Sequence, residues 1–407
     1  MDRYREPDLA SSQFKAEPYR HWSLLRDLAP VHSVRLRNGT LAWLVSRYDD
    51  AAAVLGNPQF VKDPLKAKGH GGSKPPWLPG PLRALSRNML DLDEPDHRRL
   101  RNLVQKAFTP RVVEEMRPRI EHIASGLLDA IERRGDNCAD LIADYAAPIP
   151  VTVIAELLGV AEEDRRKFHR WSNHIVAADT SLWHQLRAIP AGFAFILFLR
   201  RLIRQRREAL GDDLLSRLIE VQDEGDRLSA DELLAMCFLL LVAGHETTVN
   251  LIGNGVLALL ENPEQMQRLR DEPALIAPAV EEMLRYSSPL QLATERYATT
   301  PVTIGEVTIP RGALVYVALA SANRDEKAFS CPAEFQPDRQ PNRHLAFGHG
   351  IHYCLGAPLA RLEGQIAIRL LLERFREIYL VPESRDLRWR QGLVLRGVEA
   401  LPVIVSR

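Results

Sequence analysis

Helical periodicity dominates the pattern of apolar and polar positions along the chain. Five ranges repeat apolar residues at helical spacing or are rich in helix-forming residues. They are 96–109, 110–134, 164–174, 230–260 and 359–373. Pro95 stands at the start of the first range, where proline suits a helix. The pattern predicts a mainly α-helical fold, in which any β-sheets are small and peripheral.

Short strands are expected near both ends of the chain. Apolar residues alternate over 30–45 on both sides of Asn38-Gly39, a two-residue turn signal, and this predicts a hairpin. Asp49 or Asp50 is then expected to cap a short helix that runs to Leu55. β-branched residues over 303–317 predict further strands.

The stretch 62–81 is rich in Lys, Gly and Pro and predicts a long irregular loop. Loops of this length in compact proteins are often functional. The stretch 191–199 is unusually apolar but too short to span a bilayer, which needs about 20 residues. Core packing is its default interpretation. Lining a ligand channel is an alternative, and light membrane contact is the least favoured one.

The 230–260 candidate carries polar residues inside an apolar helix. Residues 233–243 are continuously apolar, so we expect burial on all sides. A membrane span is the competing interpretation, but Glu246, Asn250 and Asn254 would then lie at great cost inside a bilayer. The hydroxyl of Thr247 can bond to the carbonyl one turn earlier, which bends a helix and opens space. A carboxylic acid beside that hydroxyl can relay protons and hold water.

Composition bounds the protein's class. The 407 residues contain no low-complexity linker or repeat, which favours a single domain over residues 1–407. Lys plus Arg and Asp plus Glu number 53 each, so the net charge favours neither nucleic acid nor an anionic membrane as a partner. The polar N-terminus shows no signal peptide or membrane anchor, and four scattered cysteines fit a cytoplasmic location.

Cys354 stands among glycines directly before a helix-forming run. The helix N-terminus favours an anion and is expected to lower the pKa of the thiol. Gly348, Gly350 and Gly356 would let the backbone approach a flat ligand, and Phe347 offers an apolar wall. A lone cysteine is more often a small buried hydrophobe. The surrounding pattern instead suits a thiolate that binds a metal beside a planar macrocycle.

The pattern Phe-Gly-x-Gly-x-His-x-Cys-x-Gly, complete from Phe347 to Gly356, resembles the haem-binding loop of the cytochrome P-450 family. The resemblance runs nearly end to end and implies that Cys354 is the axial thiolate of haem b. It also implies that His97, Arg101, Arg296 and His352 hold the haem propionates. Thiolate ligation favours O–O cleavage.

The motif Ala243-Gly-His-Glu246-Thr247 resembles the family's oxygen-activation motif. By this match Glu246 delivers protons, Thr247 orients dioxygen and Ala243 lies against the haem. The resemblance also implies a set of apolar substrate contacts. They are Leu239, Val242, Leu292, Ala293, Val394 and Leu395. It further implies that the 62–81 loop covers the substrate.

Glu282 and Arg285 form a Glu-x-x-Arg pair whose helical periodicity indicates solvent exposure. The family resemblance instead implies that Arg339 of Phe335-Gln-Pro-Asp-Arg joins them in a structural trio. This trio would brace the segment before the haem loop. Cys331 lies in that segment, and the sequence gives no role for it.

We therefore predict a monomeric haem-thiolate monooxygenase that hydroxylates or epoxidises a hydrophobic small molecule. Electrons would come from a ferredoxin and its NAD(P)H-dependent reductase, because no redox domain is visible in the chain. The expected docking face is basic: Arg98, Arg99, Lys106, Arg343 and Arg361. Two alternatives remain. One is a peroxide-driven enzyme on the same scaffold, and the other is a haem sensor or carrier without turnover.

Overall fold

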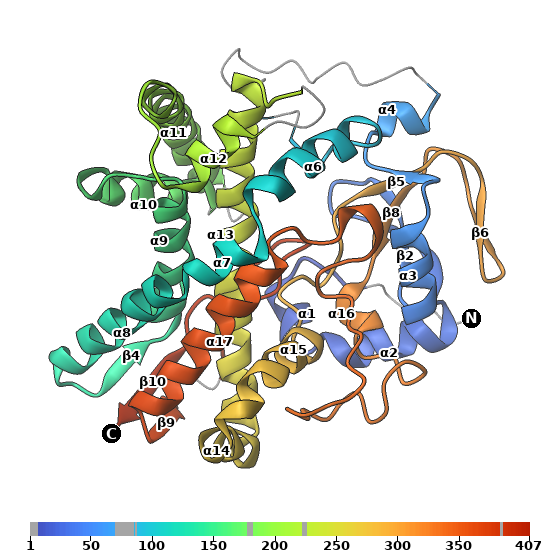
Figure 1. The fold of residues 1–407 in the computed structure, drawn as a ribbon. Coiled ribbons are helices and arrows are strands. Elements are labelled where there is room, and N and C mark those ends of the chain that lie inside the picture. Colours follow the sequence, from blue (N-terminus) through green and yellow to red (C-terminus); the bar gives the residue numbers. More distant parts are fainter. Residues whose placement is uncertain (1–6, 70–84, 86–87, 177–181, 222–225, 383–385) are drawn as a thin grey trace.

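The computed structural model describes residues 7–69, 85, 88–176, 182–221, 226–382 and 386–407. Helices make up most of it, and α13 (Ala230–Glu261) runs through its centre (Figure 1). The neighbours of α13 are α9 (Pro148–Leu157), α11 (Leu182–Glu208), α15 (Ile276–Tyr286) and α17 (Ala357–Arg374). The mainly α-helical prediction is confirmed.

The remaining described helices surround this centre. They are α1 (Ser12–Ala16), α2 (Pro18–Leu28), α3 (Tyr48–Gly56), α4 (Pro64–Ala67), α6 (Asp96–Ala107), α7 (Pro110–Glu115), α8 (Arg117–Arg134), α10 (Glu162–Val176), α12 (Leu214–Glu220), α14 (Pro263–Asp271) and α16 (Leu319–Ala322). Single turns occur at Ile142–Ala146, Pro273–Leu275 and Gly350–His352. The predicted helix 110–134 is thus two helices, α7 and α8. Of the predicted loop 62–81, only residues 62–69 are described, and residues 70–81 lie outside the described part.

Three small sheets lie at the edges of the helical body. The largest has the strand order β1–β2–β8–β5–β3, and its β2–β8 pair is parallel. A second sheet has the order β4–β10–β9, and β6 pairs with β7. The strands are β1 (Val31–Arg35), β2 (Leu41–Val45), β3 (Phe60–Val61), β4 (Cys138–Asp140), β5 (Arg296–Ala298), β6 (Val302–Ile304), β7 (Val307–Ile309), β8 (Leu314–Val317), β9 (Glu377–Leu380) and β10 (Pro402–Ser406).

The predicted hairpin over 30–45 is present as β1 and β2, whose register pairs Val31 with Val45. Its loop is longer than two residues, and Gly39 takes a left-handed φ of 81°. The predicted capping of the next helix by Asp49 or Asp50 is wrong. α3 begins at Tyr48, and the Tyr48 amide donates to Asp325 Oδ2 at 2.8 Å. A carboxylate nearly 280 residues away therefore caps α3.

α13 has the length and apolarity of a membrane-crossing helix. Its polar residues nevertheless have protein partners, since Asn254 Nδ2 donates to the carbonyl of Arg396 at 2.9 Å. A capping box of Ser229 and Glu232 fixes its N-terminus. α13 is therefore the core helix of the fold. The apolar stretch 191–199 lies in α11 and places Phe195, Ile196 and Leu199 in the same core, as its default interpretation predicted.

Glu282, Arg285 and Arg339 form a buried ion cluster. Arg285 donates to both carboxylate oxygens of Glu282 at 2.7 Å, and Arg339 Nε donates to Glu282 Oε1 at 3.0 Å. The Glu282 and Arg285 side chains are 0% exposed. The exposure indicated by helical periodicity is wrong, because the segment 332–342 covers this face of α15 and adds the Asn342 amide to the carboxylate.

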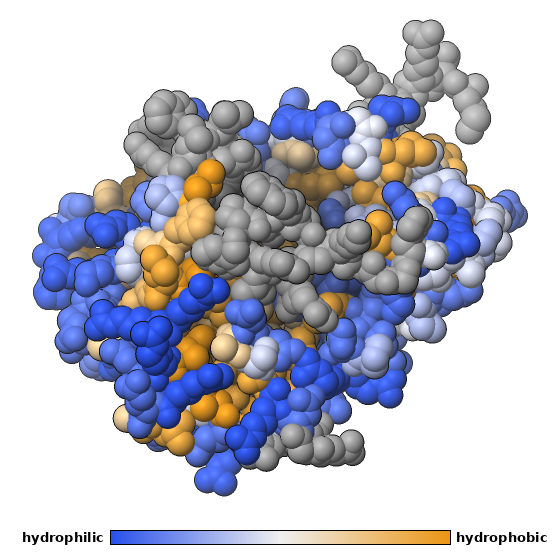
Figure 2. Space-filling model, turned by 90° about the horizontal axis from the view of Figure 1, so that it is seen from above, coloured by the Kyte–Doolittle hydropathy of each residue, from blue (hydrophilic) through white to orange (hydrophobic). Residues whose placement is uncertain are grey.

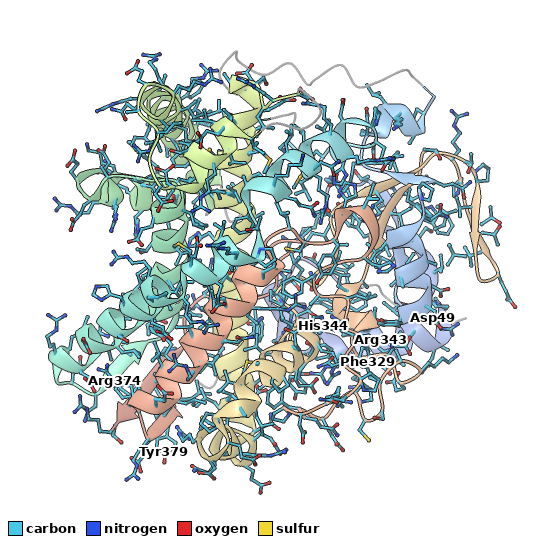
Figure 3. All side chains as sticks on the ribbon, in the orientation of Figure 1. Asp49, Phe329, Arg343, His344, Arg374 and Tyr379 are labelled. Carbon is cyan, nitrogen blue, oxygen red and sulfur yellow. The ribbon has the colours of Figure 1, made fainter. Side chains whose placement is uncertain are left out.

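The spare guanidinium donors of the cluster hold the covering segment in place. Arg285 donates to the carbonyls of Asn323, Pro332 and Glu334, and Arg339 donates to those of Ser330, Cys331 and Glu334. Cys331 has a left-handed φ of 43° and an exposed side chain, so its backbone carbonyl is what the cluster uses. Figure 3 shows Phe329, Arg343 and His344, which flank this segment, near Asp49 at the start of α3.

Replacement of Glu282 by Ala should lower the free energy of unfolding by about 3–5 kcal/mol, because two buried guanidinium groups lose their counterion. Urea unfolding of the haem-loaded protein measures this loss. The matched control is Glu373→Ala, which breaks an i,i+4 pair with Arg369 whose carboxylate is 51% exposed. The control should cost at most about 1 kcal/mol. Equal losses in the two variants would contradict a structural role for the cluster.

Candidate active site

A cavity of about 1100 Å³ opens beside the middle of α13. Four stretches far apart in sequence contribute to its wall: α6, α13, residues 289–296 and the loop that leads into α17. A fifth, the terminal loop (residues 389–396), contributes residues 391–395. In the view of Figure 2, hydrophobic patches lie among hydrophilic residues on the upper face of the molecule. Most of the residues that line the cavity are apolar, as suits a ligand held mainly by shape and desolvation.

Cys354 lies on the cavity wall just before α17 begins at Ala357. Its amide donates to the carbonyl of Phe347 at 2.9 Å, which closes the loop into a tight turn. Gly350 has a φ of 75°, and a Cβ there would lie 2.8 Å from the carbonyl oxygen of Leu55. Glycine is therefore required at this position, because the loop packs directly on the end of α3.

The pKa of the Cys354 thiol differs from the sequence prediction. Burial raises its pKa, although the amides of Gly356 and Ala357 and the charges of Arg101 and Arg361 act in the opposite direction. The predicted lowering of this pKa by the helix N-terminus is wrong for the protein alone, because desolvation outweighs it. A bound metal cation would ionise the thiol, as it does any coordinating thiol.

Four basic side chains converge on one edge of the cavity. The rings of His97 and His352 lie 4.3 Å apart, and Arg101 and Arg296 complete the group. Burial and cationic neighbours, His97 first among them, lower the pKa of His352 to about 2. Burial lowers the pKa of Arg296 to about 10, and Asp93 opposes this shift. Arg296 is 4% exposed, and its Nε has no hydrogen-bond partner among the described residues. No described carboxylate forms an ion pair with Arg101 or Arg296, and a ligand with carboxylates would supply that partner.

The Glu246–Thr247 pair lies where α13 borders the cavity. Thr247 Oγ1 donates to the Ala243 carbonyl at 2.7 Å, as the sequence predicted. Val242 is 39% exposed and Ala243 is also exposed. The expected burial of residues 233–243 on all sides is therefore wrong, because the cavity replaces protein contacts on this face. Glu246 Oε1 accepts from Arg390 at 2.9 Å, and no feature of the sequence indicated this partner.

Glu363 is a second acid on the cavity wall that sequence reasoning missed. It lies on α17, is 2% exposed, and its Oε1 has no hydrogen-bond partner in the described part of the chain. Burial raises its pKa to about 8, and a hydrogen bond with Thr248 opposes the rise. Nothing in the helical pattern distinguishes this residue from a surface acid.

Most predicted substrate contacts do line the cavity. Leu239, Val242, Ala293, Val394 and Leu395 all contribute to its wall. Leu292 does not. Its side chain is fully buried in a separate core with Phe14 and Trp22, so its prediction as a substrate contact is wrong. Its neighbours Leu290 and Thr294 face the cavity instead, because the backbone turns Leu292 toward the N-terminal helices. Within residues 289–296, regular strand begins only at Arg296, the first residue of β5.

Comparisons with known proteins agree with this geometry. The sequence matches the family model described as Cytochrome P-450 over residues 42–396. The chain belongs to the cytochrome P-450 family. Cytochrome P-450 107B1 of Saccharopolyspora erythraea is 46% identical, with 98% of each chain covered. The 6-deoxyerythronolide B hydroxylase of the same organism is 44% identical, also with 98% of each covered. The solved structure of the Bacillus subtilis P-450 PksS is 41% identical, with a TM-score of 0.91, 99% of this chain and 100% of that chain covered.

As a cytochrome P-450, the protein uses haem and is a monooxygenase of small molecules that takes electrons from separate redox proteins. The residues present fit this cofactor. A cysteine faces the cavity, and the orphaned Nε of Arg296 lies in a cluster whose arginines have no described carboxylate partner. The two carboxylates of protoporphyrin IX would match the positive charge of this cluster.

The raised pKa of Glu363 predicts how the stability of the fold depends on pH. Its folded pKa of about 8 exceeds its unfolded value, so the folded state holds the proton more tightly. This contribution to stability is complete below the unfolded pKa of about 4.3 and is lost as pH rises toward 8. Urea unfolding at several pH values should show Glu363→Gln losing less stability across this window than the parent protein, by up to about 1.4 kcal/mol per pH unit. Parallel pH profiles would contradict the raised pKa.

Proposed function

We propose that Cys354 binds the haem iron through its thiolate. Of the four cysteines, Cys138 and Cys331 are exposed away from the cavity and Cys237 is buried in the core. Cys354 is the one that lines the cavity. This placement beside the basic cluster is the observation that carries the proposal. The thiolate-bound haem supplies cleavage of the O–O bond of dioxygen.

The basic cluster would hold the haem carboxylates. Arg101 and Arg296 offer charged donors, and His97 and His352 offer ring N–H groups at the same edge of the cavity. Ala243, Phe347 and Gly356 would border the flat faces of the ring, because small or planar side chains permit close approach. Glu282, Arg285 and Arg339 would act structurally, since none of them lines the cavity in the described part of the protein.

Glu246 and Thr247 would manage protons at the cavity. The hydroxyl of Thr247 is held by the Ala243 carbonyl, so its oxygen lone pairs remain available to accept a hydrogen bond from water or substrate. Glu246, which directly precedes Thr247, can donate and accept protons. The Arg390 guanidinium fixes its position. An acid next to an oriented hydroxyl can pass protons to reduced oxygen before peroxide escapes.

Thr247→Ala should uncouple electron use from product formation, with the yield of product per NAD(P)H falling about 100-fold, the lower end of the range typical of an acid–base group. The measurement compares NAD(P)H consumption, peroxide and product in a reconstituted ferredoxin system. Thr247→Ser keeps the hydroxyl and is the matched control, so it should remain coupled. Full coupling in Thr247→Ala would contradict the proton-handling role.

The electron donors are proposed to be a ferredoxin and its NAD(P)H-dependent reductase, binding on a basic face. Arg98, Lys106 and Arg343 of that face are exposed and accessible to an acidic protein. Arg361 donates to Glu281 at 2.7 and 2.8 Å, so its charge is largely internal. Arg99 similarly pairs with Asp226 at 3.0 Å. A peroxide-driven alternative has less support, because the acid–threonine pair is present on the cavity wall. A sensor without turnover would not need that pair.

We propose that the substrate is a large, mainly apolar compound, such as a polyketide macrolactone. The cavity volume and apolar wall support this size and character, as does the name of the 6-deoxyerythronolide B hydroxylase among the relatives. A vitamin D(3) 25-hydroxylase is also a relative, so a sterol-like substrate is the second candidate. We further propose a cytoplasmic monomer, since the four free cysteines fit a reducing compartment.

A spectral titration separates the two candidate substrates. Substrate that displaces water from the haem shifts the Soret band, so 6-deoxyerythronolide B should shift it with at least about tenfold tighter binding than vitamin D3, a difference of about 1.4 kcal/mol. Val394→Phe, which fills the apolar wall, should weaken binding of the macrolactone. Tighter binding of vitamin D3 would contradict the polyketide assignment and leave the oxygen chemistry untouched.

A further inference from the structure

The first described residues of the chain run across the terminal loop. The amide of Gly392 donates to the Ala10 carbonyl at 3.1 Å, and the amide of Trp389 donates to Ser12 Oγ at 2.9 Å. Leu9 and Ala10 themselves reach the cavity wall. Residues 9–12 therefore form a layer behind the pocket.

Lys15 lies at the centre of this contact. Its side chain is fully buried, and its ammonium donates to the carbonyl of Arg390 at 2.8 Å and to that of Leu395. The carbonyl of Lys15 in turn accepts from Arg396 Nε at 3.0 Å. No carboxylate forms an ion pair with Lys15 among the residues that the structure describes. The two carbonyls that it binds belong to Arg390, directly before the cavity-lining residues 391–395, and to Leu395, the last of them.

A buried lysine without an ion pair lowers the stability of the fold. Burial lowers the pKa of Lys15 to about 8, which reflects the cost of keeping the charge in this position. An apolar side chain of the same length would avoid that cost. The ammonium lies where the backbone carbonyls of Arg390 and Leu395 accept from it. Charged donors make strong hydrogen bonds to such carbonyls.

The terminal loop carries two features of the active site. Val394 and Leu395 face the cavity, and Arg390 donates to Glu246 at 2.9 Å. Lys15 binds the backbone of Arg390 and of Leu395, so it constrains both features at once. Gln291 supports the same loop from the other side, through the carbonyl of Leu393 at 2.6 Å.

We propose that Lys15 is a positioning residue of the substrate pocket. Its ammonium holds the terminal loop in the conformation that sets Val394 and Leu395 against the ligand and Arg390 against Glu246. This inference rests on the haem cavity and not on the identity of the substrate.

The test uses two haem ligands of different size. Imidazole binds the iron without reaching the terminal loop, whereas 4-phenylimidazole places a phenyl ring in the adjoining pocket. Spectral titration of Lys15→Met should show 4-phenylimidazole binding about tenfold more weakly, the effect expected when a charged hydrogen bond is lost. Imidazole binding should stay unchanged. Lys15→Arg, which keeps a cationic donor, should recover most of the affinity.

Hydrogen exchange gives a readout that does not depend on the haem ligand. The amides of Trp389 and Gly392 should exchange faster in Lys15→Met than in the control Lys327→Met, an exposed lysine far from the loop. If Lys15→Met does not yield haem protein, Lys15→Gln keeps one donor and should show an intermediate loss. Equal weakening of both haem ligands, or unchanged 4-phenylimidazole binding and exchange, would overturn the proposal.

Discussion

Buried positive charge without a matching anion is the constraint on which this site depends. Arg101, Arg296, His97 and His352 meet at one edge of the cavity. Burial lowers the pKa values of Arg296 and His352, and cationic neighbours lower that of His352 further. A fold does not keep such a cluster for its own stability. If the two carboxylates of haem bind there, as proposed, binding of the cofactor and stability of this part of the fold are linked.

The walls of the cavity come from distant parts of the chain, and the same kind of interaction recurs where they join. Buried cations are anchored on backbone carbonyls of irregular segments. Arg285 and Arg339 hold the segment before the cysteine loop in this way, and Lys15 holds the terminal loop. Irregular segments expose carbonyls that no helix or sheet satisfies. A long cationic side chain can satisfy several of them from one position, which fixes a loop without regular structure.

The sequence predicted those features that depend on local order. The long helix α13 follows from its apolar run over 233–243, and the turn at Gly350 follows from the motif that surrounds Cys354. Features that depend on a neighbour distant in sequence were missed or wrong. Asp325 caps α3, residues 332–342 bury Glu282, and α1 and α2 draw Leu292 away from the cavity. Periodicity reports which face of a helix is apolar, but it cannot report a segment that later covers the polar face.

The same distinction separates the chemistry of the site from its selectivity. Glu246, Thr247 and Cys354 stand on α13 or at the start of α17, two packed core helices, and a precise reaction geometry needs rigid support. Val394 and Leu395 stand on the terminal loop, whose position depends on α1 and on residues near the start of the chain. Substitutions in that layer can reshape the pocket and leave the oxygen chemistry unchanged, because no atom of the layer needs to touch the reacting centre.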